Sequence, residues 1–448
     1  MYLYDTDEDI REMLAAIGET SVEALLAQVP EELRLQRPLD VPGPYGELEL
    51  QRHLQTLADR NVSPRNAACF LGGGAYDHFI PAVVDHVASR SEFYTSYTPY
   101  QPEVSQGNLQ ATFEYQTLIC QLTGMDVSNA SLYEGGSATA EAVLMAISQT
   151  RRYHKIVMLR SVHPEYREIV RTYLRGLGTE CREVGWNRAG QGDVDRVADE
   201  LDQETACLVV QHPNFFGVLE EVEALARAAH DRGVQVVHVF DPISLGLLKR
   251  PGDWGADLAV AEGQSLGTPL QYGGPYLGIL ACRERFLRRL PGRLAGQTVD
   301  RRGRRCWVLT LQTREQHIRR EKATSNICTN QGLFALRAAV YLSLMGPAGM
   351  REVAEQCLHK ARFARELLTA DDRYERLFDG PCFKEFAVRD RTGQIEQALH
   401  RAGEQGVLAG LPLGRWYPEL ADGLLVAVTE KRTRQEIERW AGALRASG

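Results

Sequence analysis

The sequence predicts an α/β protein whose main domain is a mostly parallel sheet with helices on both faces. Between about residues 66 and 285, short apolar runs of strand length alternate with amphipathic stretches. The runs expected to form buried strands are 155–159, 206–211, 234–240, 257–261 and 276–281. A helix is predicted at 222–230 between the second and third of these runs. The order strand, helix, strand favours right-handed crossovers and therefore parallel strands.

The first 65 residues predict a helical arm. Thr6 can cap a helix that ends before Gly18. Its apolar residues recur at helical spacing: Ile10, Met13, Leu14 and Ile17. A second helix is expected from Ser21, and prolines at 30, 38, 42 and 44 then mark an irregular connection. Such an arm packs either on its own chain or on another subunit.

A smaller α+β domain is expected at 326–448, after the large domain at 66–325. Long helices are predicted around 331–344 and 349–368, followed by a strand at 424–428. Thr433 and Glu436 have the spacing of a capping box at the start of a final helix.

Composition excludes several classes of protein. The 448 residues are 44% hydrophobic and 25% charged, which is typical of a globular protein. The formal net charge of −8 argues against nucleic-acid binding. No apolar run suggests a membrane span, and the N-terminal residues do not resemble an export signal. The nine cysteines are scattered and none forms Cys-x-x-Cys, so we expect no metal site, no disulfide framework and a reducing cytoplasm.

A glycine turn leads into an alanine-rich helix within 131–142. Glu134, Gly135, Gly136 and Ser137 stand at its predicted start. Backbone N–H groups at a helix start bind anions, and the Ser137 hydroxyl adds a donor. The turn therefore predicts either a phosphate site or a capped helix without a ligand.

Two further polar residues follow predicted strands. Asp241 comes directly after the run 234–240, at the strand end where open α/β sheets place ligands. An aspartate there can hold the proton on the ring nitrogen of pyridoxal phosphate, or it can be a turn residue. His212 ends the strand before and is either a catalytic imidazole or a structural donor.

The glycine turn, the strand-end residues and Asp241 come in the order found in pyridoxal-phosphate enzymes of the aspartate aminotransferase fold. Those enzymes need a lysine for the Schiff base, roughly 20 to 30 residues after the aspartate. Residues 261–269 contain no lysine. Lys249 follows Asp241 too closely, and Lys322 lies beyond the next strand. The sequence therefore predicts that this chain forms no Schiff base of its own.

Four stretches carry a specific resemblance to a known family: 72–78, 91–103, 321–331 and 426–432. They begin Gly-Gly-Gly-Ala-Tyr, Ser-Glu-Phe-Tyr-Thr, Glu-Lys-Ala-Thr-Ser and Val-Ala-Val-Thr-Glu. In these stretches, and nearly end to end, the sequence resembles the glycine cleavage system P-protein family, in particular the alpha chains (subunit 1) of its two-subunit form.

The resemblance implies a fold type I pyridoxal-phosphate architecture and a part in the oxidative decarboxylation of glycine. In this family the aminomethyl group passes to the lipoyl arm of the H-protein. The resemblance also implies a homologous beta subunit that carries the cofactor, in an α2β2 assembly. Aligning 255–257 with that subunit sets Gln264 and Ser265 against its His-Lys pair, so Ser265 takes the place of the Schiff-base lysine.

Two sets of site residues follow from the resemblance. A vestigial cofactor pocket is expected from Glu134, Gly135, Gly136, Ser137, His212, Asp241, Gln264 and Ser265. An accessory site toward the partner's substrate channel is expected from Tyr94, Tyr97, Thr98, Tyr100, Gln101, Lys322, Thr324, Ser325, Asn326 and Asn330. Tyrosines also favour interfaces without chemistry, so interface packing alone remains the alternative for the tyrosine-rich residues. The residues of 322–331 can simply cap the helix that follows them.

Two other functions compete with an accessory subunit. One is a self-sufficient pyridoxal-phosphate lyase or transferase that uses Lys249 or Lys322. The other is a non-catalytic scaffold or regulatory subunit whose polar residues have structural roles only.

Overall fold

The structure is a computed structural model that describes residues 4–271, 273–323 and 325–446. The chain divides into two compact units, Met1–Val62 and Ser63–Gly448. Each unit is described by itself.

The first unit is an arm of short helices: α1 (Asp7–Ala16), α2 (Val22–Leu25), the 3-10 turn η1 (Glu31–Leu33) and α3 (Glu47–Ala58). Thr6 caps α1 in a capping box with Asp9, and Ser21 caps α2, which confirms both predicted helix starts. No described residue of this unit is buried. The apolar stripe of α1 and the leucines of α3 at 50, 54 and 57 are exposed or only partly covered.

The second unit contains a seven-stranded sheet in the order β2-β8-β7-β6-β5-β3-β4. Its strands are β2 (Val127–Ser128), β3 (Lys155–Leu159), β4 (Glu180–Val184), β5 (Thr205–His212), β6 (Gln235–Phe240), β7 (Leu258–Glu262) and β8 (Gly278–Cys282). The pairs among β3 to β7 are parallel, which confirms the predicted mostly parallel sheet. Strand β8 runs antiparallel to β7 and β2. The described residues of the link from β7 to β8, 263–271 and 273–277, form no helix of the kind that a parallel crossover needs.

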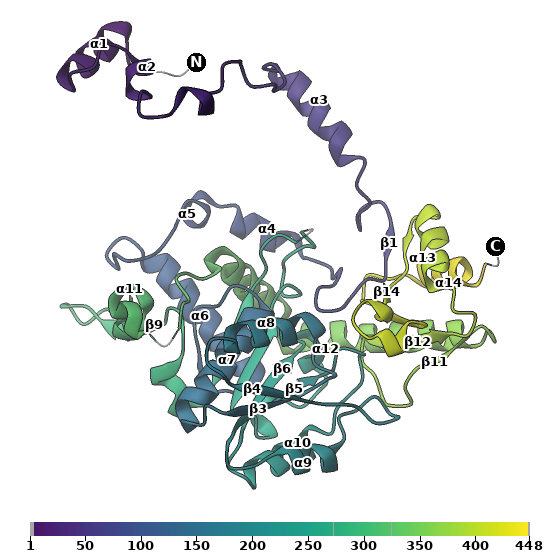
Figure 1. Ribbon diagram of the computed structural model, residues 1–448. Helices are drawn as coiled ribbons and strands as arrows, with labels where there is room; N and C mark the ends of the chain where they lie inside the picture. Colours follow the sequence, from purple (N-terminus) through teal and green to yellow (C-terminus); the bar gives the residue numbers. More distant parts are fainter. Residues whose placement is uncertain (1–3, 272, 324, 447–448) are drawn as a thin grey trace. The chain divides into compact units, whose positions relative to one another are not determined.

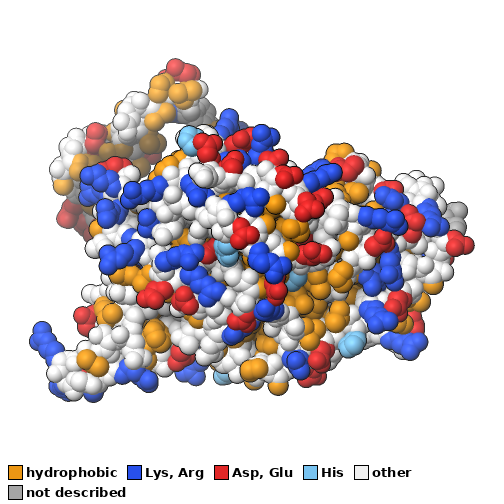
Figure 2. All heavy atoms as spheres, turned by 90° about the horizontal axis from the view of Figure 1, so that it is seen from below, with side chains coloured by type: hydrophobic (Ala, Val, Ile, Leu, Met, Phe, Trp, Pro, Cys, Tyr) orange, Lys and Arg blue, Asp and Glu red, His pale blue; other side chains and the backbone are white. Residues whose placement is uncertain are grey.

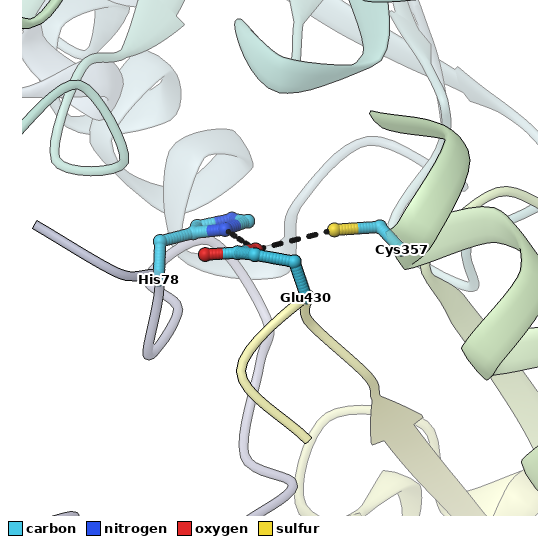
Figure 3. A group of neighbouring side chains, drawn as sticks. All are labelled: His78, Cys357 and Glu430. Carbon is cyan, nitrogen blue, oxygen red and sulfur yellow. Dashed lines mark hydrogen bonds and ion pairs between the residues drawn. The ribbon is translucent and has the colours of Figure 1, made fainter. Parts of the chain in front are cut away.

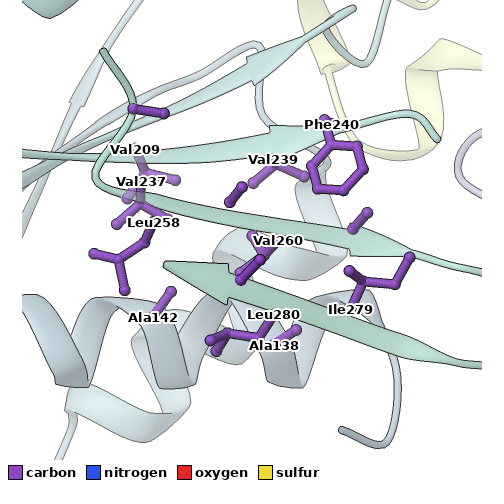
Figure 4. Packing of buried hydrophobic residues seen from close by; sticks show 14 of the residues in the cluster. Ala138, Ala142, Val209, Val237, Val239, Phe240, Leu258, Val260, Ile279 and Leu280 are labelled. Carbon is purple, nitrogen blue, oxygen red and sulfur yellow. The ribbon is translucent and has the colours of Figure 1, made fainter. Parts of the chain in front are cut away.

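Helices cover both faces of this sheet (Figure 1). The helices of this region are α4 (Ala82–Ala88), α5 (Ser91–Tyr94), α6 (Gln106–Thr123), α7 (Gly135–Thr150), α8 (Pro164–Leu174), α9 (Val194–Glu200) and α10 (Val222–His230). Helices α7 and α8 pack together on one side, and α9 and α10 lie on the other. Figure 4 shows Ala138 and Ala142 of α7 facing Leu258, Val260 and Leu280 of the strands. The alanines bring α7 close to the sheet and so fix where its N-terminus lies.

A second sheet has the order β11-β12-β15-β14 and is antiparallel. The remaining elements are β1 (Ala68–Cys69), β9 (Ala295–Val299), β10 (Arg305–Leu309), α11 (Gln316–Arg319), α12 (Gly332–Thr369), β11 (Tyr374–Arg376), β12 (Glu385–Asp390), α13 (Ile395–Glu404), β13 (Val407–Leu408), β14 (Leu411–Pro412), β15 (Gly423–Ala427) and α14 (Arg434–Arg445). Thr433 and Glu436 form the predicted capping box of α14. Ala68 and Phe70 join the core of this sheet, and the first half of α12 joins the core of the large sheet. The division at residues 65 and 325 stays a prediction.

Helix α12 links the two cores. It bends at Gly346, which has φ +57° and precedes Pro347. Within the described part of the chain, it is the one helix long and apolar enough to cross a membrane by length and composition. Its buried residues pack in the cores of both sheets, as a core helix does.

Figure 2 shows one face of the molecule, on which basic and acidic side chains are interspersed with small apolar groups. This face therefore lacks a large field of one sign, the feature that draws polyanions to a surface.

Gly217 sets the contact between the loop after β5 and strand β12. Its φ is +80°, and a Cβ there would overlap the backbone carbonyl of Glu385. We expect Gly217→Ala to lower the free energy of unfolding by about 2–4 kcal/mol, because it combines left-handed strain with overpacking. Gly442→Ala is the control, since nothing lies within 4 Å of its Cβ position in α14. That substitution should stabilise by about 0.5–1 kcal/mol in the same urea titration. Equal effects of the two substitutions would contradict this account.

Candidate functional site

The N-terminus of α7 is occupied by a carboxylate of the chain itself. Glu134 accepts the N–H of Gly136 at 2.5 Å and that of Ser137 at 2.8 Å. The Ser137 hydroxyl also donates to Glu134. Glu262, at the end of β7, accepts the N–H of Gly135 at 3.1 Å. The backbone donors that would hold a phosphate are therefore bonded to two internal carboxyl groups.

The two glycines of this turn are required by packing. A Cβ on Gly135 would overlap the Tyr166 hydroxyl, and one on Gly136 would overlap the side chain of Ile169. Tyr166 in turn stacks on His163, with ring centroids 4.4 Å apart. Both side chains come from the β3–α8 region and cover the start of α7. Sequence reasoning gave neither a role, because nothing in the local pattern distinguishes them.

Asp241 lies at the end of β6, where the sequence predicts it, and it is paired inside the chain. Its Oδ2 lies 2.7 Å from Nζ of Lys384, and its Oδ1 accepts the N–H of Ile243 at 3.0 Å. Lys384 comes from the start of β12 in the second sheet and is only 1% exposed. Its Nζ lies 3.5 Å from the Tyr76 ring centroid and also donates to His78 Nε2 at 3.1 Å.

Glu385 and Gln264 fasten the segment 73–76 beside this ion pair. Glu385 accepts the N–H of Gly73 at 2.7 Å and the Tyr76 hydroxyl at 2.8 Å. Gln264 bonds both the N–H and the carbonyl of Tyr76, at 2.8 and 3.0 Å. Burial is the main cause that raises the pKa of Glu385, to about 7.

Two buried histidines of this region, His212 and His163, have structural partners. His212 accepts the N–H of Glu220 at Nδ1, and burial lowers its pKa to about 4. It does not line the cavity beside Asp241, whereas its neighbours Gln211 and Pro213 do. His163 does line that cavity and donates from Nε2 to the Gly73 carbonyl at 2.6 Å. Burial lowers its pKa to about 4 as well, so both rings are neutral.

Ser265 lines the same cavity, which is too small for the cofactor. Its hydroxyl is buried and, among the described residues, has no hydrogen-bond partner. The cavity holds about 30 Å³. Pockets for ligands of cofactor size hold roughly 300–1,000 Å³. Neither lysine weighed for self-sufficient chemistry is near, because Lys249 pairs with Glu223 and Lys322 is exposed. The residues present do not fit pyridoxal phosphate.

The raised pKa of Glu385 predicts a pH dependence. Between its ordinary value of 4.5 and about 7, the folded state binds this proton and the unfolded state does not. Stability should therefore fall as the pH rises through this window. Glu385→Gln keeps the hydrogen-bonding shape and cannot titrate. We expect urea titrations from pH 4.5 to 7 to show that the free energy of unfolding of this variant falls less steeply with pH than that of the unaltered chain. The difference in slope should be up to about 1.4 kcal/mol per pH unit. Parallel slopes would contradict the assignment.

A second, larger cavity lies beside the tyrosine-rich segment. It holds about 210 Å³ and is lined by Tyr94, Tyr97, Thr98, Asn330 and Arg293, among others. The structure thus brings four of the predicted accessory residues to one cavity. Tyr97 is 89% exposed, so a large aromatic side chain stands open at this site.

Arg293 is a charged member of this cavity that was not predicted from the sequence. It is 5% exposed and donates to Thr329 Oγ1 at 3.1 Å, Asn330 Oδ1 at 2.9 Å and the Cys328 carbonyl at 3.3 Å. Its guanidinium also lies 5.7 Å from the Tyr100 ring centroid. Arg293 thereby joins the tyrosine-rich segment to the segment 328–330.

The other predicted accessory residues that the structure describes, Tyr100 among them, lie outside the lining of this cavity. Gln101, Lys322 and Asn326 are exposed, and Ser325 is half-buried and accepts the N–H of Ile327. Thr324 lies outside the described residues.

His78, Glu430 and Cys357 form a cluster (Figure 3) that contacts Lys384 through His78. Glu430 Oε2 lies 2.7 Å from His78 Nδ1 and 3.4 Å from Cys357 Sγ. A metal on Nδ1 would require the ring proton on Nε2, facing the Lys384 ammonium. An ammonium can only donate, so the 3.1 Å contact assigns Nε2 as the acceptor from Lys384 and Nδ1 as the donor to Glu430. We therefore assign the cluster a structural role.

The sheet, the glycine turn before α7 and the aspartate after β6 define the class of the protein: the pyridoxal-phosphate fold type I. A sphingosine-1-phosphate lyase from Burkholderia pseudomallei shares this fold, with a TM-score of 0.66 over 92% of each chain and 17% identity. The chain belongs to the glycine cleavage system P-protein family, whose model matches residues 1–444.

Individual relatives agree over the full length. A probable glycine dehydrogenase (decarboxylating) subunit 1 from Desulforamulus reducens is 52% identical over 99% of both chains. The protein of the same name from Carboxydothermus hydrogenoformans is 53% identical over 98% of this chain and 97% of its own. A crystal structure of glycine decarboxylase (P-protein) of the glycine cleavage system, in inhibitor-bound form, has a TM-score of 0.89 and 43% identity over 99% of each chain.

Proposed function

We propose that this chain is the accessory alpha subunit of a glycine dehydrogenase (decarboxylating). It takes part in the oxidative decarboxylation of glycine, with transfer of the aminomethyl group to the lipoyl group of an H-protein. A homologous beta subunit carries the pyridoxal phosphate, in an α2β2 assembly. The relatives that match end to end support the reaction, since they are named subunit 1 of this enzyme. The serine at 265 and the small cavity around it support the division of labour, because no amine stands at the Schiff-base position. Lys384, which also lines the cavity, is paired with Asp241.

The cavity at Tyr94, Tyr97 and Arg293 is the part of this chain that we assign to the partner's reaction. Rigid aromatic rings can form walls while their hydroxyls orient a polar group. The Arg293 guanidinium is held beneath them by its bonds to 328–330. We propose that these residues border the channel of the beta subunit and help to admit the lipoyl arm. We also propose a cytoplasmic location, which the nine free cysteines support.

Reconstitution from separately purified subunits tests this function. Glycine–bicarbonate exchange should require this chain, the lysine-bearing partner and the H-protein together. Exchange by this chain and H-protein alone would favour a self-sufficient enzyme. Full exchange by the partner and H-protein alone would favour the scaffold function.

A further inference from the structure

We infer that two side chains of this chain stand in for the two polar ends of the absent cofactor: the Glu134 carboxylate for a phosphate and the Lys384 ammonium for a protonated ring nitrogen. The missing lysine is then only one of three barriers to cofactor binding. This inference deepens the proposed function, because it explains why only the partner holds pyridoxal phosphate.

The phosphate end carries the first half of the inference. A helix N-terminus favours a negative group, and here that group is the Glu134 carboxylate. It accepts two backbone hydrogen bonds and one from a hydroxyl. Glu262 takes the remaining glycine N–H. Tyr166 lies over the same turn, against Gly135. The site is thus built for an anion and holds one that is covalently part of the chain.

The ring-nitrogen end carries the second half. An aspartate at the end of β6 is placed to accept a bond from a cationic N–H. Lys384 provides that donor at 2.7 Å, and its ammonium lies over the Tyr76 ring. Because Glu385 is the first residue of β12 and Lys384 directly precedes it, the same contacts fasten the second sheet to the large one.

The stacked rings of His163 and Tyr166 line the remaining cavity. The Ser265 hydroxyl, which has no hydrogen-bond partner among the described residues, lines it too. The remaining volume of about 30 Å³ is far below that of a ligand site. The pocket is therefore closed by groups that match its electrostatics, which differs from a pocket that has merely lost its lysine.

Both substitutes can be tested in the full-length chain by removing the side chain of Glu134 or Lys384 and adding a small ion that can replace it. Glu134→Ala should lower the melting temperature, and inorganic phosphate should restore it by several degrees more than sodium chloride of equal ionic strength. Lys384→Ala should likewise be restored by ethylammonium chloride. Lys249→Ala, which removes a surface ion pair, is the matched control and should respond to neither ion. If neither rescue exceeds the response of the control, the inference is wrong.

A lysine at the Schiff-base position provides an independent test. Ser265→Lys alone, incubated with pyridoxal phosphate and reduced with borohydride, should gain no more adduct at position 265 than the unaltered chain. Equimolar adduct there would overturn the inference and leave the proposed function intact, since reconstituted exchange with the unaltered chain measures that function separately. If this variant does not fold, the two rescue experiments decide.

Discussion

Replacing Lys384 with methionine is expected to lower the free energy of unfolding by about 3–5 kcal/mol. The substitution keeps the length of the side chain and removes its charge. Asp241 would then remain partly buried with one oxygen unpaired, and His78 Nε2 would lose its donor. Removing one partner of a buried pair costs more than removing both. The double variant Lys384→Met with Asp241→Asn should therefore be more stable than the single variant.

Urea denaturation of the full chain at pH 7 measures both variants. Lys249→Met is the matched control, because Lys249 pairs with Glu223 at the surface. It should change stability by less than about 1 kcal/mol. A Lys384→Met variant as stable as the control would show that the buried pair does not hold the second sheet.

The second large effect is expected on activity, from Arg293→Gln in the reconstituted complex. The substitution removes the bonds that hold segment 328–330 against the tyrosine-rich segment. Misplacement by about 1 Å can cost about a hundredfold in rate, so we expect glycine–bicarbonate exchange to fall by about tenfold to a hundredfold. The loss should be in kcat more than in the KM for glycine, because the residue positions the channel wall.

Arg305→Gln serves as the control, since Arg305 is exposed on β10. It should leave exchange unchanged. Tyr97→Phe and Lys322→Ala report on the predicted accessory residues individually. If Arg293→Gln and both of these variants retain full exchange in an intact complex, the accessory site fails and an interface role remains.

Periodicity was enough to predict most of the fold. The runs 155–159 and 206–211 and the helix at 222–230 match β3, β5 and α10, because buried parallel strands and amphipathic helices leave clear local patterns. The antiparallel direction of β8 left no such pattern. It follows from the connection between β7 and β8, whose described residues form no helix, a feature visible only in the structure.

The candidate site shows the same limit. Asp241 was predictable, since it directly follows a buried strand. Its partner Lys384 was not, because it lies on another sheet and no local pattern records that contact. Glu134 was included in the predicted pocket. Its hydrogen bonds to Gly136 and Ser137 could not be predicted, because they depend on the conformation of its side chain. Its position three residues before Ser137, as a potential helix cap, was the one available signal.

The location of the cofactor tests the central claim most directly. The reconstituted complex is reduced with borohydride in the presence of pyridoxal phosphate, digested, and searched by mass spectrometry for phosphopyridoxyl-lysine. Our account predicts one adduct per beta subunit and none on this chain, whether it is in the complex or alone. A stoichiometric adduct on any of its six lysines, Lys384 included, would contradict the account.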